Sequence, residues 1–89
     1  MFSVQLTERA RKQLKQLDHF QARLLLDWMQ TRLEGIENPR AFGKALTGNK
    51  KGFWRYRAGN YRIICDIQDN ICLILVISVG HRKEVYNKE

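Results

Sequence analysis

Residues 53–86 read FWRYRAGNYRIICDIQDNICLILVISVGHRKEVY. Segments 53–57 and 61–67 alternate in polarity on either side of an Ala-Gly-Asn turn, and an apolar segment, 71–79, follows Asp69-Asn70. Short connections rich in Gly, Asn and Asp between β-branched and aromatic runs are typical of β-hairpins. The stretch therefore predicts three consecutive strands that end in a basic tip.

The alternation of side chains assigns the first two arginines of this stretch to one face of the sheet. Successive side chains of a strand point to opposite faces, so Arg55 and Arg57 share a face while Trp54 and Tyr56 take the other. Arginine donates paired hydrogen bonds to phosphate and stays charged at any working pH. The alternative for either arginine alone is a charge that protects an edge strand from aggregation.

Arg62 lies on a strand that is expected to be more central, where an unpaired cation needs a reason. Asp66 shares its face and offers a structural salt bridge as the alternative to phosphate binding. If Asp69-Asn70 is a two-residue turn, Arg62 faces Ile77 across the second hairpin. Residues after the last strand, such as Arg82, then emerge near the arginines.

The tip adds two side chains that can take part in acid–base chemistry. Imidazole exchanges protons near neutral pH and arginine does not, so His81 is the candidate for proton transfer. Tyr86 can stack on a base, orient a phosphate or donate a proton. The alternatives are an exposed histidine beside two cations and a tyrosine that packs on the sheet.

The residues before this stretch are expected to form a scaffold. Residues 2–6 alternate as a strand, Thr7 is a plausible N-cap of a helix over 8–17, and Asp18 caps a second helix that stops at Gly35. The short link predicts an antiparallel helical hairpin. The predicted fold class is α+β, with the N-terminal strand and the helical hairpin packed on one face of a small, mainly antiparallel four-stranded sheet.

A basic loop, residues 44–52, connects this scaffold to the strands. Lys44, Lys50 and Lys51 are candidates for binding an RNA backbone, together with Lys83 in the tip. Ordinary surface lysines are an equally good interpretation of the loop. The two cysteines are expected to be buried thiols rather than a disulfide. With the two histidines they lack the close spacing of zinc sites, so we expect no metal and no cofactor.

The composition indicates one small folded domain, residues 1–89, with a polyanionic partner. A hydrophobic content of 44% with a single proline favours a folded chain. The net charge of +7 favours nucleic acid or an acidic protein. The longest apolar run, 71–79, is too short to span a bilayer, and residues 1–6 lack the pattern of a signal peptide. We therefore expect a cytoplasmic protein without a membrane partner.

Two motifs of this chain resemble those of a known family. WRYRAGNYRII (54–64) and VISVGHRKEVY (76–86) closely resemble the RelE/ParE superfamily of bacterial toxins, in its RelE branch, and the likeness covers nearly the whole chain. Such a resemblance implies a microbial RNase-like fold and a toxin of a type II toxin–antitoxin system. It implies a metal-independent endoribonuclease that cuts mRNA in the ribosomal A site, with a cognate antitoxin and the ribosome as partners.

The resemblance also implies which residues act on the RNA. Basic residues bind the scissile phosphate and assist attack by the 2'-hydroxyl, which gives a cyclic phosphate. The matching positions are Arg55, Arg57 and Arg62 on the strands and Arg82 and Tyr86 near the C-terminus, with His81 at a position that is basic in relatives. The RelE type has lysines where this chain has Arg55 and Arg57. Arginine is a poor general base, so we expect it to stabilise charge on the phosphate oxygens.

Two other functions remain open. One is a ParE-like protein that inhibits DNA gyrase by binding it, without catalysis, and the other is a plain nucleic-acid-binding domain. Arg82 and Tyr86 at the RelE-type positions favour the nuclease. Leu73, Leu75 and Ile77 are expected to share the face of Arg62, where an antitoxin segment could cover them.

Overall fold

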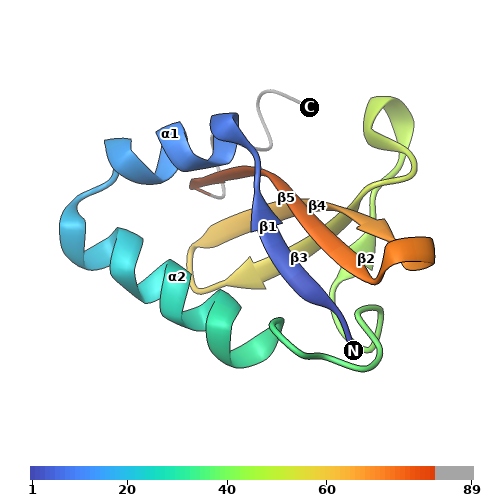
Figure 1. The fold of residues 1–89 in the computed structure, drawn as a ribbon. Helices are drawn as coiled ribbons and strands as arrows, with labels where there is room; N and C mark the ends of the chain where they lie inside the picture. Colours follow the sequence, from blue (N-terminus) through green and yellow to red (C-terminus); the bar gives the residue numbers. More distant parts are fainter. Residues whose placement is uncertain (82–89) are drawn as a thin grey trace.

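The computed structural model describes residues 1–81 of the chain, which form a mixed sheet of five strands with two helices on one face (Figure 1). The elements are β1 (Ser3–Leu6), α1 (Glu8–Gln16), α2 (His19–Arg32), β2 (Lys44–Ala45), β3 (Trp54–Ala58), β4 (Tyr61–Gln68) and β5 (Leu73–His81). The strand order is β1-β5-β4-β3-β2. β1 pairs parallel with β5, and the other three pairings are antiparallel. The predicted α+β class is confirmed.

One strand was not expected. Lys44–Ala45 pairs with β3 and forms the second edge of the sheet, so the described sheet has five strands instead of four. Two residues are too few to show alternation, which explains why the sequence indicated only a loop. Within residues 1–81, neither helix is long and apolar enough to cross a bilayer.

The helix caps follow the sequence. The Thr7 hydroxyl accepts a hydrogen bond from the Ala10 N–H at the start of α1, and the Asp18 carboxylate accepts one from the Gln21 N–H at the start of α2. Such caps satisfy backbone donors that have no partner within the helix. Figure 1 shows the two helices running in opposite general directions from the link between them, as expected for a helical hairpin.

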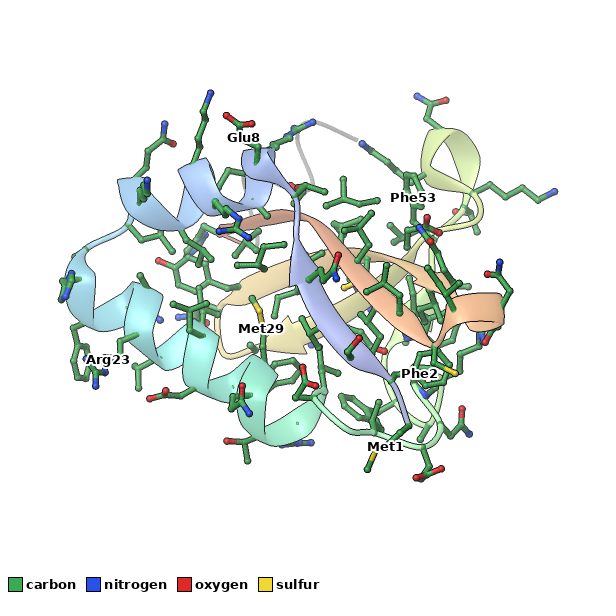
Figure 2. The ribbon with its side chains drawn as sticks, viewed as in Figure 1. Met1, Phe2, Glu8, Arg23, Met29 and Phe53 are labelled. Carbon is green, nitrogen blue, oxygen red and sulfur yellow. The ribbon has the colours of Figure 1, made fainter. Side chains whose placement is uncertain are left out.

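The core lies between the helices and one face of the sheet. Figure 2 shows Met29 pointing from α2 toward the sheet, while Arg23 points away from it. The buried residues that form this core are Phe2, Ala10, Leu14, Leu25, Met29, Leu33, Tyr56, Ala58, Ile63, Cys65, Ile74, Val76 and Val79. The sheet face opposite to the helices therefore carries the alternate residues of β3 and β4.

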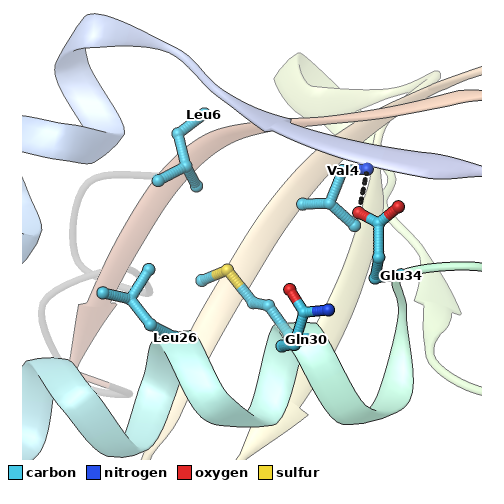
Figure 3. A pocket seen from close by; sticks show the side chains of 6 residues that line it. Val4, Leu6, Leu26, Gln30 and Glu34 are labelled. Carbon is cyan, nitrogen blue, oxygen red and sulfur yellow. Dashed lines mark hydrogen bonds between the residues drawn. The ribbon is translucent and has the colours of Figure 1, made fainter.

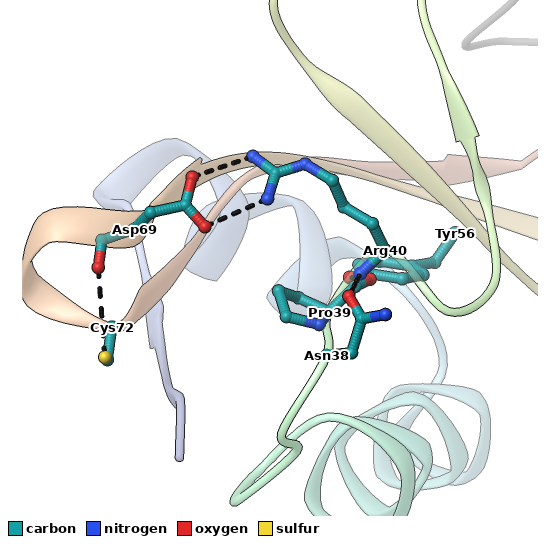
Figure 4. Close-up of polar contacts among 6 residues, drawn as sticks. All are labelled: Asn38, Pro39, Arg40, Tyr56, Asp69 and Cys72. Atoms are coloured by element: carbon teal, nitrogen blue, oxygen red, sulfur yellow. Dashed lines mark hydrogen bonds and ion pairs between the residues drawn. The ribbon is translucent and has the colours of Figure 1, made fainter.

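The segment between α2 and β2 accepts hydrogen bonds from two side chains of β3, one of which, Tyr56, is drawn in Figure 4. The Tyr56 hydroxyl donates a hydrogen bond to the Pro39 carbonyl, and the Trp54 indole N–H donates one to the Phe42 carbonyl at 2.9 Å. Arg40 in the same segment donates two hydrogen bonds of 2.9 Å to the Asp69 carboxylate. The β4–β5 turn is thereby tied to the segment that leads into β2.

The expected register of the second hairpin is wrong. Gln68 pairs with Leu73, so four residues connect β4 to β5, and Arg62 pairs with Gly80 instead of Ile77. A 3-10 turn, Asp69–Ile71, is followed by Cys72 with φ of 51°, and this adds two residues to the predicted turn. Cys72 is consequently exposed in the turn rather than buried, and its thiol is free.

Candidate functional site

Four basic residues lie side by side on the helix-free face of the sheet. Arg57 is the cross-strand partner of Arg62, and Lys44 is the partner of Arg55, which lies two residues before Arg57 on β3. Side chains of paired residues share a face. Since Tyr56 on the same strand points into the core, these residues point away from the helices. We call Lys44, Arg55, Arg57 and Arg62 the cationic face.

Two arginines of the cationic face lie directly opposite each other. Arg62 is only 2% exposed, and its cross-strand partner Arg57 is exposed. Like charges that face each other across a strand pair tend to destabilise it, and arginine is seldom so fully buried. Such an arrangement suits an anion, because phosphate oxygens accept hydrogen bonds from guanidinium groups.

Asp66 also points to this side of the sheet, where it pairs with Leu75. Its carboxylate accepts a hydrogen bond of 2.9 Å from the Gln68 amide. Leu73 pairs with Gln68, so Leu73 and Leu75 share the face of Arg62 as predicted. Ile77, the third residue of that prediction, has no cross-strand partner in the β4–β5 register.

His81 lies on the other side of the sheet. It pairs with Tyr61, and the two rings meet edge to face with centroids 5.6 Å apart. Tyr61 packs against the core beneath the helices. The structure therefore does not bring His81 onto the cationic face. Arg82, Lys83 and Tyr86 lie outside the described residues.

The other two predicted RNA-binding lysines lie in the connection between β2 and β3. Lys50 ends the short 3-10 helix Gly48–Lys50, and Lys51 follows it. The Leu46 N–H donates a hydrogen bond to the Phe53 carbonyl, which closes the base of the connection. This connection projects beyond the sheet at one end in Figure 1. Lys44 differs from both, because strand pairing fixes it beside Arg55.

Two buried groups on the core side, Tyr56 and Cys65, are unsuited to proton transfer near neutral pH. Burial raises the pKa of the Tyr56 phenol and of the Cys65 thiol above their ordinary values. Within residues 1–81, no group of three His, Cys, Asp or Glu side chains is placed to hold a metal ion. What the described site offers is fixed positive charge for binding phosphate oxygens.

A small hollow of about 150 Å³ lies on the helix side, between β1 and α2 (Figure 3). Val4, Leu6, Leu26 and Met29 give it an apolar lining, and Gln30 and Glu34 lie at one end. The Glu34 carboxylate accepts a hydrogen bond of 3.0 Å from the Val4 N–H. The sheet separates this hollow from the cationic face.

Comparison with known sequences assigns the family. The family described as "ParE toxin of type II toxin-antitoxin system, parDE" matches residues 4–86. This chain belongs to the ParE toxin family. The predicted membership of the RelE/ParE superfamily is thereby confirmed. No curated protein matches the chain significantly.

Solved structures similar to this ParE-family chain include RelE toxins. The toxin–antitoxin complex RelBE2 from Mycobacterium tuberculosis contains a chain that is 26% identical, with a TM-score of 0.82 and 91% of each chain covered. The isolated E. coli RelE toxin is 23% identical, with a TM-score of 0.68 over 99% of this chain and 94% of that one. RelE in the archaeal RelE–RelB complex from Pyrococcus horikoshii is 24% identical, with a TM-score of 0.68 and coverage of 91% and 94%.

Proposed function

We propose that this chain is a ribosome-dependent endoribonuclease that cuts mRNA in the A site. The observation that carries the proposal is the pair Arg57 and Arg62, which face each other on the helix-free side of the sheet beside Arg55. The RelE fold of the chain, with residues that match the RelE motifs, supports the same activity.

The proposed reaction is an internal transfer at a phosphodiester. The 2'-oxygen forms a bond to phosphorus as the bond from phosphorus to the 5'-oxygen breaks, which leaves a 2',3'-cyclic phosphate and a 5'-hydroxyl. One proton leaves the 2'-hydroxyl and one reaches the 5'-oxygen. Arg55, Arg57 and Arg62 stabilise the charge on the phosphate oxygens but accept no proton. We assign proton donation to Tyr86, because the structure does not bring His81, the other candidate, onto the cationic face, and we assign activation of the 2'-hydroxyl to another group or to the ribosome.

We propose a cognate antitoxin as the protein partner, in a cytoplasmic system without a membrane component. The RelE toxins of M. tuberculosis and P. horikoshii occur in complexes with antitoxins. The net charge of +7 and the cationic face suit a partner that carries acidic side chains. A small acidic or DNA-binding protein encoded beside this gene is the expected antitoxin.

Induction of the gene followed by primer extension tests the proposed activity. We expect new 5' ends within translated mRNA, and their loss in Arg62→Ala, Arg82→Ala and Tyr86→Phe. Arg11→Ala is the matched control, since Arg11 is exposed on α1. Cuts that appear equally in untranslated RNA, or that persist in the three variants, would contradict the proposal.

The second candidate function is non-catalytic inhibition of DNA gyrase. One observation favours it, which is that the family matching residues 4–86 is described as a ParE toxin. A supercoiling assay with purified protein separates the two functions. Inhibition of gyrase without new mRNA ends would establish the second candidate.

A further inference from the structure

A one-residue bulge divides the pairing of β5 with β4 into two registers. From Gln68–Leu73 to Cys65–Val76 the partners follow one register, and from Ile64–Ser78 to Tyr61–His81 they follow another. Ile77 is the extra residue between them. Bulges of this kind leave backbone groups outside the ladder and re-aim the side chains that follow.

Two side chains from the N-terminal part of the chain hold this bulge. The Thr7 hydroxyl donates a hydrogen bond of 3.1 Å to the Ile77 carbonyl, and the Gln13 side-chain oxygen accepts one of 2.7 Å from the Val79 N–H. The Thr7 backbone N–H also donates to the Val76 carbonyl. Thr7 and Gln13 thus supply partners to the backbone on both sides of Ser78, from the helix side of the sheet.

The bulge decides which residue lies beside Arg62. If the first register continued, Arg62 would pair with Val79, whose side chain would then lie on the cationic face. The extra residue instead places Gly80 opposite Arg62 and turns Val79 into the core, where it is buried. Gly80 is not one of the glycines with positive φ, so its backbone does not require glycine. Gly80 therefore places no side chain opposite the buried arginine.

We propose that Gln13 and Thr7 are positioning residues for the cationic face. By fixing the bulge they keep a glycine opposite Arg62, so that no β5 side chain lies between the guanidinium and a phosphate on the cationic face. The expected effect on cleavage rests on the proposed nuclease function, whereas the placement of Gly80 does not. Thr7 also caps α1, so Gln13 is the residue on which the proposal is tested.

The test compares Gln13→Leu, which removes the acceptor at similar size, with Gln13→Glu, which keeps an acceptor oxygen. Gln16→Leu makes the same change at an exposed position of α1. In Gln13→Leu we expect the Val79 amide to exchange about fivefold faster. We expect kcat for cleavage of ribosome-bound mRNA to fall about 100-fold with KM nearly unchanged. Gln13→Glu and Gln16→Leu should behave as the unsubstituted protein.

Gly80→Ala provides an independent variant should Gln13→Leu fail to fold. We expect an unchanged or higher unfolding midpoint, because alanine restricts the unfolded chain, together with a lower kcat. Unsubstituted kcat in Gly80→Ala, or in a Gln13→Leu protein whose Val79 amide exchanges faster, would overturn the proposal. So would unchanged exchange at Val79.

Failure of the nuclease function can be told apart from failure of this inference. If the unsubstituted protein cuts no mRNA, the Arg62 side-chain N–H resonance still reports on the bulge. A shift of that resonance in Gln13→Leu that is absent in Gln13→Glu supports the positioning role. The same Arg62 resonance in Gln13→Leu and in Gln13→Glu overturns it.

Discussion

We expect the pair Arg57 and Arg62 to lower the stability of the protein and to support its function. They face each other on adjacent strands, one exposed and one buried, so two like charges stand opposite each other across the strand pair. In the proposed function both guanidinium groups act on one phosphate. We expect the protein without a bound anion to be less stable than a variant in which one of these two charges is removed.

Arg57→Ala is therefore expected to raise the free energy of unfolding while it removes activity. The gain should be about 0.5 kcal/mol, the scale of a cross-strand charge pair, and cleavage should fall about 100-fold, as when an electrostatic donor is lost. Urea unfolding and an mRNA cleavage assay measure the two effects. A loss of stability in Arg57→Ala, with Arg11→Ala neutral, would show that the repulsion is already compensated.

Tyr56 provides the contrasting case of a residue with a purely structural bond. Its buried hydroxyl donates to the Pro39 carbonyl, and burial keeps its pKa above the ordinary range. Tyr56→Phe should cost about 1 kcal/mol of stability and leave cleavage unchanged. Thermal unfolding and primer extension check the two parts. Loss of cleavage with intact stability would place the phenol in the reaction instead.

At the scale of elements, β2 depends on the close approach of Gly43 to β3. Gly43 has φ of +90°, and a Cβ there would lie 2.5 Å from the Trp54 indole nitrogen and 2.6 Å from the Arg55 carbonyl oxygen. The adjacent residue, Lys44, owes its place beside Arg55 to this packing.

Gly43→Ala is expected to displace β2 and cost about 3 kcal/mol, from the positive φ and the clash together. Gly48→Ala is the matched control, because Gly48 also has positive φ but open space around it. The control should cost only about 1 kcal/mol. Chemical unfolding of the two variants measures the difference, and equal costs would mean that the contact with β3 is readily relieved.

The two hydrogen bonds from Arg40 to Asp69, which form a fork, make a second connection between elements. Their contribution to stability depends on pH. The hydrogen bonds from Arg40 are the main cause that lowers the pKa of Asp69 below its ordinary value. A depressed pKa means that the contribution to stability is present above the ordinary carboxylate pKa of about 4 and is lost as the pH falls through the lower, folded value.

Asp69→Asn should therefore lower the unfolding temperature at neutral pH by a small amount, since the pair is exposed. The difference from the unsubstituted protein should vanish in acid. Thermal unfolding between neutral pH and about pH 3 follows the convergence. Parallel curves over the whole range would mean that the fork adds nothing to the turn.

For the whole molecule, the alternation and caps in the sequence were enough to predict the helices, the four longer strands and the shared face of Arg55 and Arg57. The alternation does not show where a strand takes in an extra residue. The bulge at Ile77 changes every pairing after it, and so the face of His81 was not foreseen. β2 was not predicted because a strand of two residues shows no alternation of side chains.

RNA binding by the whole chain should weaken steeply with salt. Each phosphate contact to a single strand contributes about 0.7 to the slope of log affinity against log salt. Lys44→Ala should reduce the slope by about that amount, because Lys44 lies on the cationic face. Lys12→Ala, on α1 and paired with Glu8, should leave it unchanged. Filter binding of a short RNA over a salt series measures both, and equal slopes would remove Lys44 from the interface.

The position of β5 between β1 and β4 governs when the sheet can be completed during synthesis. β5 lies between β1, which is made first, and β4, and it is the last described strand to leave the ribosome. The helices and the β3–β4 hairpin can form early, but β1 has no neighbouring strand until β5 emerges. The sheet is therefore completed by contacts between residues about 70 positions apart, which close slowly. In the nascent chain, the β3–β4 hairpin that carries Arg55, Arg57 and Arg62 therefore exists before β5 joins it to β1.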